Sequence, residues 1–397
     1  MAEGSILVQK YGGSSVATPE RIKAVAAHVV RTKEQGHKVV VVVSAMGENT
    51  DHLLSLARQV TPHPDRRELD MLLSVGERIS MALLSMAVKA LGHDAISFTG
   101  SQCGIMTNDN HFAARIVEVR PFRVQDELDR GRIVIVAGYQ GTSYKREVTT
   151  LGRGGSDTTA VALAAALGAE ACEIYSDVDG VYSADPRVIP EARHLPALGH
   201  GETAALALAG AKVLNAQAVQ LAREKGIAIH ARATRDPLGR ETVVRLDAPP
   251  LEPRVVAVTG RRDLVLLAGP AGERPLARLA EVASGHALAL HWSESHGTIE
   301  VLLDPEESEI VAPAGWERRA GLSTVAAVGN GIDKAPQLCA RILDLLQEGG
   351  WPVEDLTLSE AALTARLGVG DSRPAQRLLH ERLIASGGEP EAAQTVR

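Results

Sequence analysis

The feature that most constrains the fold is a regular alternation of short apolar runs and longer amphipathic stretches over the first 235 residues. The run 38–44 is rich in valine, which suits a strand buried on both faces of a sheet. The stretch 18–35 before it predicts a helix, with Thr18 as the N-cap and Pro19 in the first helical position. Such alternation predicts an α/β sandwich: a mainly parallel sheet with helices on both faces.

The same reasoning predicts the remaining elements of this part of the chain. Further strands are expected at 6–9, 95–99, 133–137, 171–175 and 227–231. Further helices are expected at 68–91, 157–167, 202–208 and 215–225.

A turn-rich stretch between Asp236 and Pro253 indicates a domain boundary. We therefore expect a first domain over residues 1–240. The tail predicts two small α+β units, 254–320 and 321–385. In the first unit we expect strands at 255–258, 264–268, 287–292 and 298–303 and a helix at 276–283, and the second unit has the order β-α-β-β-α. A frayed tail is expected at 386–397.

Composition narrows the class of protein. The formal charge of −7 and the isoelectric point near 6.0 disfavour a nucleic-acid partner, which selects for a basic surface. Three widely spaced cysteines without a CxxC pair indicate reduced thiols rather than a zinc site or a disulfide framework. No apolar run is long enough to span a bilayer and no signal peptide is apparent, so we expect a soluble, cytoplasmic protein with no membrane partner.

Three glycine-rich or polar segments follow predicted strands or precede predicted helices, and they carry most of the chemical information. The first segment is Lys10-Tyr-Gly-Gly-Ser-Ser-Val, in which Gly12 and Gly13 let backbone N–H groups approach a phosphate. Lys10 adds a point charge for phosphate oxygens, and Ser14 adds a hydroxyl. Read alone, a Gly-Gly turn of this kind is structural about as often as it is functional.

The second segment, Gly-Arg153-Gly-Gly-Ser-Asp157, stands just before a predicted helix. Glycines at a helix N-terminus form an anion site, and Arg153 can hold a carboxylate through two hydrogen bonds. Asp157 has a structural alternative as the N-cap of the helix.

The third segment, Ser176-Asp-Val-Asp-Gly-Val-Tyr-Ser-Ala-Asp-Pro-Arg, follows the strand 171–175. Ligands of open α/β sheets gather beyond the carboxyl ends of strands, so these polar groups suit a nucleotide. A calcium loop is a rival interpretation, but the twelve-residue ligand pattern and its closing glutamate are missing. The chain also lacks a P-loop motif and the protein-kinase motif set.

Two shorter pieces complete the set. Ser44-Ala-Met-Gly-Glu-Asn-Thr50 follows the second strand, and Gly-Glu77-Arg-Ile-Ser lies on the long predicted helix. An acidic residue on an apolar helix face is costly to bury unless it is paired, so Glu77 is either a surface residue or a binding group.

These motifs, in this order and together with Gly-Ala-Lys212-Val-Leu, resemble those of the aspartokinases within the amino acid kinase superfamily. The tail resembles their paired ACT regulatory domains, mainly over 323–383. The resemblance implies ATP-dependent phosphorylation of the side-chain carboxylate of L-aspartate, as the first step of lysine, threonine and methionine biosynthesis. It also implies ATP with Mg²⁺ as cofactor, no protein metal site, and a homo-oligomer formed through the C-terminal domains.

The resemblance assigns each motif a role. Lys10 and Asp157 would be catalytic. ATP would be bound by Lys10, Gly12, Gly13, Ser14, Ser176, Asp177, Tyr182, Arg187, Lys212 and Val213. Aspartate would be bound by Ser44, Thr50, Glu77, Arg153, Gly154, Gly155 and Ser156, with Glu77 taking the ammonium and Arg153 a carboxylate.

The chain departs from the family pattern in two places. Asn215-Ala216 stand where the family usually has His-Pro, and the turns of the tail lack a clear Asp-x-Pro-Gly match. Lysine or threonine inhibition therefore does not carry over. Two alternatives remain: a catalytically silent regulatory or scaffold homologue, and a kinase of a related acidic amino acid.

Overall fold

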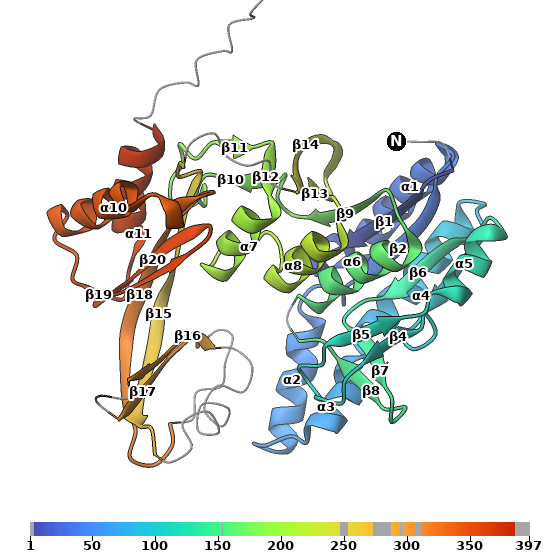
Figure 1. Cartoon of the computed structure of the whole chain (residues 1–397). Helices are drawn as coiled ribbons and strands as arrows, with labels where there is room; N and C mark the ends of the chain where they lie inside the picture. Colours follow the sequence, from blue (N-terminus) through green and yellow to red (C-terminus); the bar gives the residue numbers. More distant parts are fainter. Residues whose placement is uncertain are drawn as a thin grey trace, which may run out of the picture. The chain divides into compact units, whose positions relative to one another are not determined.

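The computed structural model describes residues 4–152, 154–246, 253–272, 287–293, 295, 297–305 and 312–385 (Figure 1). The chain forms two compact units, and each is described by itself. The first unit comprises Met1–Val181, Leu195–Ala204 and Lys212–Ala248. The second comprises Tyr182–His194, Ala205–Ala211 and Pro249–Arg397.

An eight-stranded sheet in the order β12-β14-β13-β9-β1-β2-β6-β3 forms the centre of the first unit. Every neighbouring pair with a described register is parallel except β13 and β14, which are antiparallel. This confirms the mainly parallel sheet that the sequence predicts. The strands are β1 Ile6–Tyr11, β2 Lys38–Val43, β3 Ala95–Phe98, β6 Ile133–Ala137, β9 Ala171–Ser176, β12 Ala197–Gly199, β13 Ile229–Ala233 and β14 Asp236–Arg245.

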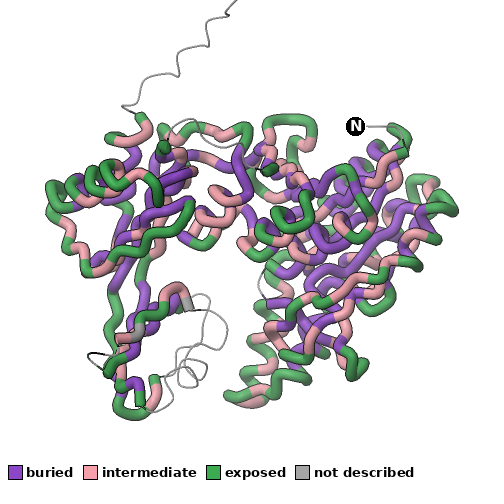
Figure 2. Tube along the Cα trace, in the orientation of Figure 1, coloured by how far each residue is buried: buried purple, intermediate pink, exposed green. Residues whose placement is uncertain are grey.

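Helices cover both faces of this sheet, and β2 shows why. Val39, Val41 and Val43 pack into one core cluster, with α1 and α4, whereas Val40 and Val42 pack into the other, with α5, α6 and α8. Successive side chains of a strand point to opposite faces, so a run of valines buries both, as the purple central strands of Figure 2 show. The helices of this unit are α1 Pro19–Glu34, α2 Asn49–Val60, α3 Arg66–Leu73, α4 Val75–Ala90, α5 Phe122–Asp129, α6 Gly155–Leu167 and α8 Ala216–Lys225, with the 3-10 helix η1 Gly13–Val16. Helix α7 His200–Leu208 is divided between the two units.

One predicted helix is two helices in the structure. The stretch 68–91 is split at Ser74, where α3 ends and α4 begins. The Ser74 hydroxyl donates to the Met71 carbonyl at 3.0 Å, and the Ser74 carbonyl accepts from the Gln140 amide at 2.8 Å. The break between α3 and α4 thus falls at a residue that is hydrogen-bonded both to its own helix and to β7.

The span Arg66–Ala90 is apolar and long enough to cross a membrane by composition alone, but 44% of its most apolar window is buried inside the protein. Leu84 and Val88 lie in the core cluster beside α1. The apolar composition of this span therefore reflects in part its packing in the core of the first unit.

The sequence did not predict the smaller sheet of the first unit, which has the order β5-β4-β7-β8. Its strands are β4 Ile105–Thr107, β5 Ile116–Val119, β7 Gln140–Ser143 and β8 Val148–Thr150. They have three or four residues each, too few to show a period in the sequence. The two-stranded sheet β10-β11, Val181–Tyr182 and His194–Leu195, was not predicted either.

An antiparallel sheet in the order β16-β17-β15-β18-β20-β19 forms the second unit. Its elements are β15 Ala257–Pro270, β16 Ala287–Ser293, β17 Thr298–Leu303, β18 Glu317–Val328, β19 Val353–Ser359 and β20 Ala362–Leu367, with helices η2 Ile332–Lys334, α10 Pro336–Glu348, α11 Arg373–His380 and η3 Glu381–Ala385. The predicted order β-α-β-β-α is confirmed from β18 to α11.

One long strand, β15, joins what the sequence divides into two strands. Separate strands were predicted at 255–258 and 264–268, but β15 is continuous, and irregularities in its pairing with β18 fall between Arg261 and Leu266. The predicted helix 276–283 and the tail 386–397 lie outside the described residues.

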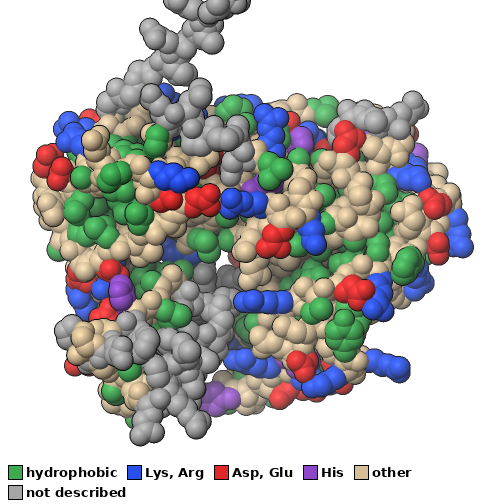
Figure 3. Space-filling view, viewed as in Figure 1, with side chains coloured by type: hydrophobic (Ala, Val, Ile, Leu, Met, Phe, Trp, Pro, Cys, Tyr) green, Lys and Arg blue, Asp and Glu red, His purple; other side chains and the backbone are tan. Residues whose placement is uncertain are grey.

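Charged side chains of both signs are interspersed over the face of the molecule shown in Figure 3. The three cysteines are free, and burial raises the pKa of the Cys103 and Cys172 thiols.

Candidate active site

The carboxyl ends of four parallel strands meet at one edge of the large sheet. Strand β1 lies between β2 and β9, so the chain leaves β1 at a point where the order of connections reverses. Ligands of open α/β sheets bind at such a switch point. Three of the predicted segments begin here, after β1, β2 and β9.

An ion pair joins the first and second motifs. Lys10 Nζ lies 2.6 Å from Asp157 Oδ1, and the two side chains are 12% and 10% exposed. Asp157 is in the first turn of α6, but it is not the N-cap, because Gly154 holds that position without a side-chain hydrogen bond. The structural alternative for Asp157 is therefore wrong, and its carboxylate faces the lysine of the phosphate motif.

The turn after β1 packs backbone against backbone on the turn after β2. A β-carbon on Gly13 would lie 2.9 Å from the Ala45 carbonyl oxygen and 3.0 Å from that of Gly47. The Gly47 N–H donates to the Gly13 carbonyl at 3.0 Å. The Gly12 N–H is held by the Tyr175 carbonyl at 3.1 Å. The glycines at 12 and 13 thus allow three strand ends to meet, while Ser14 is exposed.

Glu77 is buried beside the turn after β2, with only 3% of the residue exposed. Its Oε1 accepts from the Ala45 N–H at 3.1 Å, whereas the buried Oε2 has no hydrogen-bond partner in the described part of the chain. Burial raises the pKa of Glu77 to about 7, against the opposing effect of the backbone N–H groups. The surface alternative for Glu77 is wrong, and an unpaired buried carboxylate oxygen suits a cationic ligand.

Two further predicted residues lie around Glu77. The Ser44 carbonyl accepts from the Ser80 hydroxyl at 2.7 Å, one turn of α4 beyond Glu77. The Thr50 hydroxyl oxygen lies 3.9 Å from where a β-carbon of Gly76 would stand. A β-carbon there would also lie 2.8 Å from the Ala45 side chain, so glycine allows α4 to approach the turn.

The second motif begins α6 with a left-handed glycine. Gly154 has φ +73°, and a β-carbon on Gly155 would lie 2.7 Å from Leu151 Cβ. Ser156 packs against the end of β6, where a β-carbon on Gly138 would lie 2.7 Å from the Ser156 hydroxyl oxygen. Arg153, the guanidinium predicted to bind a carboxylate, lies outside the described residues.

The predicted nucleotide residues are divided between the two units. In the first unit, the Ser176 hydroxyl accepts from the Val178 N–H at 3.3 Å, and Asp177 follows it on an exposed turn. Lys212 is exposed and Val213 packs partly buried against the core, just before α8.

Tyr182 and Arg187 belong to the second unit. Tyr182 packs edge-to-face on His194, and Arg187 forms a two-point ion pair with Asp185, its NH2 lying 2.8 Å from Oδ2. The structure does not place these two residues relative to Lys10.

Sequence reasoning missed two residues at this edge. Asn215 was noted only as a departure from the family pattern, yet it caps α8 through its own Oδ1 and lies against Gly154. Gly138 leaves room for Ser156, and its position directly after a buried strand was the available signal.

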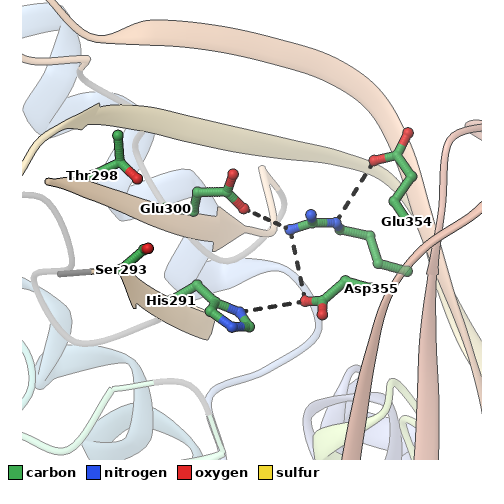
Figure 4. Close-up of a pocket in the computed structure, with 7 residues that line it drawn as sticks. His291, Ser293, Thr298, Glu300, Glu354 and Asp355 are labelled. Atoms are coloured by element: carbon green, nitrogen blue, oxygen red, sulfur yellow. Dashed lines mark hydrogen bonds and ion pairs between the residues drawn. The ribbon is translucent and has the colours of Figure 1, made fainter. Parts of the chain in front are cut away.

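The second unit contains a separate polar pocket of about 350 Å³ on β16, β17, β19 and β20 (Figure 4). Arg366 is 13% exposed; its guanidinium donates a hydrogen bond to Glu300 at 3.3 Å and lies 3.8 Å from Glu354 and 3.9 Å from Asp355. Glu354 has a closer partner in Arg319, whose guanidinium donates to it at 3.0 Å. His291 Nδ1 lies 3.6 Å from Asp355. Ion pairs across the pocket therefore connect strands β16 and β17 with strands β19 and β20.

The fold and the strand-end site define an amino acid kinase: the model of the Amino acid kinase family matches residues 5–232. An aspartokinase of Corynebacterium glutamicum is 42% identical over 98% of both chains. An aspartokinase of Thermus thermophilus is 37% identical over 95% of this chain and 98% of its own. The chain belongs to the aspartokinases, the enzymes of this family that phosphorylate aspartate.

Solved structures agree on the fold. Aspartokinase III of E. coli, in complex with aspartate and ADP, superposes with a TM-score of 0.80 over 95% of this chain and 99% of that one, at 24% identity. Aspartate kinase from Synechocystis is 34% identical, with a TM-score of 0.57 over 99% of this chain and 71% of its own. The similarity therefore extends through the C-terminal region.

Proposed function

We propose that this aspartokinase uses MgATP to convert L-aspartate to 4-phospho-L-aspartate, the first step toward lysine, threonine and methionine. The observation that carries the proposal is the Lys10–Asp157 ion pair, which stands between two glycine-rich turns at the switch point of the sheet. The complex of the E. coli relative with aspartate and ADP supports the same pair of ligands.

Lys10 and the Gly12–Gly13 turn hold the phosphates of ATP, with Ser14 at the exposed edge. The Gly12 N–H donates to the Tyr175 carbonyl and so fixes the turn, which leaves the Gly13 N–H as the backbone donor. Phosphoryl transfer depends mainly on positioning and on cations that neutralise the transferring group. Lys10 supplies that cation from the end of a rigid strand. Asp157 holds the Lys10 ammonium in place through the 2.6 Å contact.

The acceptor binds on the side of β2 and α6. Glu77 takes the ammonium through its unpaired Oε2. Burial raises the pKa of Glu77, and a bound ammonium offsets that effect because it stabilises the ionised carboxylate. Arg153 takes a carboxylate. The remaining acceptor contacts come from Ser44, Thr50, Gly154, Gly155 and Ser156.

The chemical step needs no strong base. The side-chain carboxylate of aspartate is ionised near neutral pH, so one of its oxygens attacks the γ-phosphorus directly. A new O–P bond forms as the bond between that phosphorus and the bridging oxygen of ADP breaks, and ADP leaves with the electron pair. The chain's own residues position the two substrates and stabilise charge.

Mg²⁺ enters with ATP. Magnesium keeps several waters and takes one or two carboxylates together with substrate phosphates. The ion would be held mainly by the ATP phosphates and by water, because Asp157 Oδ1 is already paired with the Lys10 ammonium. When bound, the ion neutralises phosphate charge.

The other parts of the proposal rest on the predicted organisation. Ser176, Asp177, Tyr182, Arg187, Lys212 and Val213 bind the nucleotide. Residues 1–240 form the catalytic domain, and 254–320 and 321–385 form ACT-like units through which copies of the chain associate in the cytoplasm. Light scattering of the full chain and of a chain ending at residue 246 tests that association.

The function is tested by trapping the acyl phosphate with hydroxylamine. Purified protein is incubated with MgATP and aspartate, glutamate, N-acetylglutamate or no acceptor. Hydroxamate with aspartate alone is the expected result. Hydroxamate with another acceptor would support a related acidic-amino-acid kinase. No hydroxamate from a folded chain that binds ATP would support the silent regulatory homologue.

A further inference from the structure

A fully buried carboxylate outside the motif residues holds the segment that leads into the second motif. Asp70 lies on α3 and is 0% exposed. Its Oδ1 accepts from the Thr150 hydroxyl at 2.5 Å and from the Phe112 N–H at 3.0 Å. Its Oδ2 lies 2.6 Å from His111 Nδ1. One side chain thus joins a helix, a strand end and a loop.

The end of β8 leads directly into the second motif, 152–157, whose glycine-rich loop is proposed to bind the acceptor. Thr150 ends β8, two residues before Gly152 and three before Arg153. The Thr150 carbonyl also accepts from the Ala114 N–H at 2.9 Å, so both its side chain and its backbone are fixed. The start of the glycine-rich loop is therefore set by contacts to Asp70 and to the 108–114 loop.

The 108–114 loop, which contacts Asp70 through His111 and Phe112, contains a residue in an unfavourable backbone conformation. Phe112 has φ +69°, a left-handed value that non-glycine residues rarely adopt. Its carbonyl oxygen lies 3.5 Å from where a β-carbon of Gly152 would stand. Such backbone strain persists only when surrounding contacts hold it, and the hydrogen bond from the Phe112 N–H to Asp70 is one of these contacts.

We propose that Asp70 is a positioning residue for the acceptor: it ties Thr150 and the His111–Phe112 turn together and so fixes Thr150 and Gly152, which lead into the acceptor motif. This inference rests on the proposed role of Arg153 in binding the acceptor. Asp70 touches neither substrate and acts through Thr150 and Gly152. The nucleotide-facing turns, which are held by β1 and β9, do not depend on it.

The test compares Asp70→Asn with Asp65→Ala. Asp65 caps the same helix through the Arg67 and Glu68 N–H groups but is exposed, and within the described part of the chain its carboxylate hydrogen bonds stay on this helix. Loss of that cap weakens α3 without releasing Thr150. Thr150→Val, which removes one contact at nearly constant volume, is the second variant should Asp70→Asn fail to fold.

We expect Asp70→Asn and Thr150→Val to raise KM for aspartate on the order of tenfold or more, because a small misplacement of a binding loop is costly, while KM for ATP stays within about twofold. The double variant should be little worse than Asp70→Asn alone, since both changes break one network. Asp65→Ala should leave both constants near those of the unchanged protein. An unchanged KM for aspartate, or parallel changes of both constants in all variants, would overturn the proposal.

Amide hydrogen exchange separates this proposal from the proposed function. Peptides covering 108–115 and 148–156 should exchange faster in Asp70→Asn but not in Asp65→Ala. If the unchanged protein forms no hydroxamate with aspartate, the function fails, yet faster exchange confined to these peptides still supports the positioning step. Unchanged exchange in Asp70→Asn overturns that step whatever the activity.

Discussion

The Asn215 side chain packs against Gly154 in the space that a side chain at position 154 would need: a β-carbon on Gly154 would lie 2.1 Å from Nδ2 of Asn215 and 2.6 Å from its Cγ. Asn215 is itself fixed, because its Oδ1 accepts from the Ala218 N–H at 3.1 Å as the N-cap of α8. The residue that departs from the usual family pattern is therefore in contact with the glycine-rich motif.

Gly154→Ala should lower kcat/KM for aspartate strongly. Alanine at φ +73° costs about 1–2 kcal/mol, and the clash with Asn215 adds to this cost. Hydroxamate assays at varied aspartate measure the effect. Gly154→Ala combined with Asn215→Ala should recover the steric part only, so equal losses in the single and double variants would contradict the contact.

Lys10→Ala should abolish turnover in a chain that still folds. Removing the cation from a phosphoryl-transfer site costs a factor of about 10²–10³ or more in kcat. The loss of Lys10 also leaves the Asp157 carboxylate buried without its partner, so the midpoint of unfolding should fall. Lys10→Ala/Asp157→Asn should unfold later than Lys10→Ala alone. Normal turnover by Lys10→Ala would refute the phosphate assignment.

The affinity for aspartate should rise with pH through neutrality. The pKa of Glu77 is about 7, and only the ionised carboxylate attracts an ammonium. Between pH 8 and pH 6 the ionised fraction falls about tenfold, so KM for aspartate should rise by a similar factor. Glu77→Gln should show a high KM without this pH dependence. A KM for aspartate that is independent of pH in the unchanged protein would show that Glu77 does not bind the ammonium.

The raised pKa of Glu77 also predicts how the thermal stability of the ligand-free protein changes with pH. The folded-state pKa of Glu77 is raised above the ordinary value of 4.5, so the folded protein retains a proton that the unfolded chain releases. This contribution to stability is fully present below 4.5 and is lost as pH rises through 7. Thermal unfolding at pH 5 to 8 should therefore show a smaller decline in Glu77→Gln than in the unchanged protein.

Arg366→Met should destabilise the second unit by about 1 kcal/mol, because Glu300 and Asp355 lose a shared cation while Glu354 keeps its pair with Arg319. Denaturant unfolding measures the loss. Arg341→Met, at an exposed position on α10, is the matched control and should change stability by less than about 0.5 kcal/mol. Adding Asp355→Asn to Arg366→Met should restore part of the stability, and no recovery would argue against carboxylate repulsion as the cause.

The division between sequence and structure is clearest at the catalytic edge. Glycine pairs, strand ends and a lysine are local signals, so Lys10, Gly12 and Gly13 could be predicted. The contact between Lys10 and Asp157 spans 147 positions, and only the packing of α6 on the sheet brings the two together. Helix periodicity likewise suggested one helix at 68–91, and the contact between Gln140 and Ser74, at the break between the two observed helices, is not local.

The sequence by itself determined the alternating α/β pattern, the buried valine strand and the order of the motifs, because these depend on residue type and on neighbours in the chain. Tertiary structure decided which polar groups are paired. It buried Glu77 with one oxygen free, set Asn215 against Gly154, and gave Asp70 three partners from distant segments. Burial and hydrogen bonding between distant segments set the cost of a charge, and no local pattern encodes them.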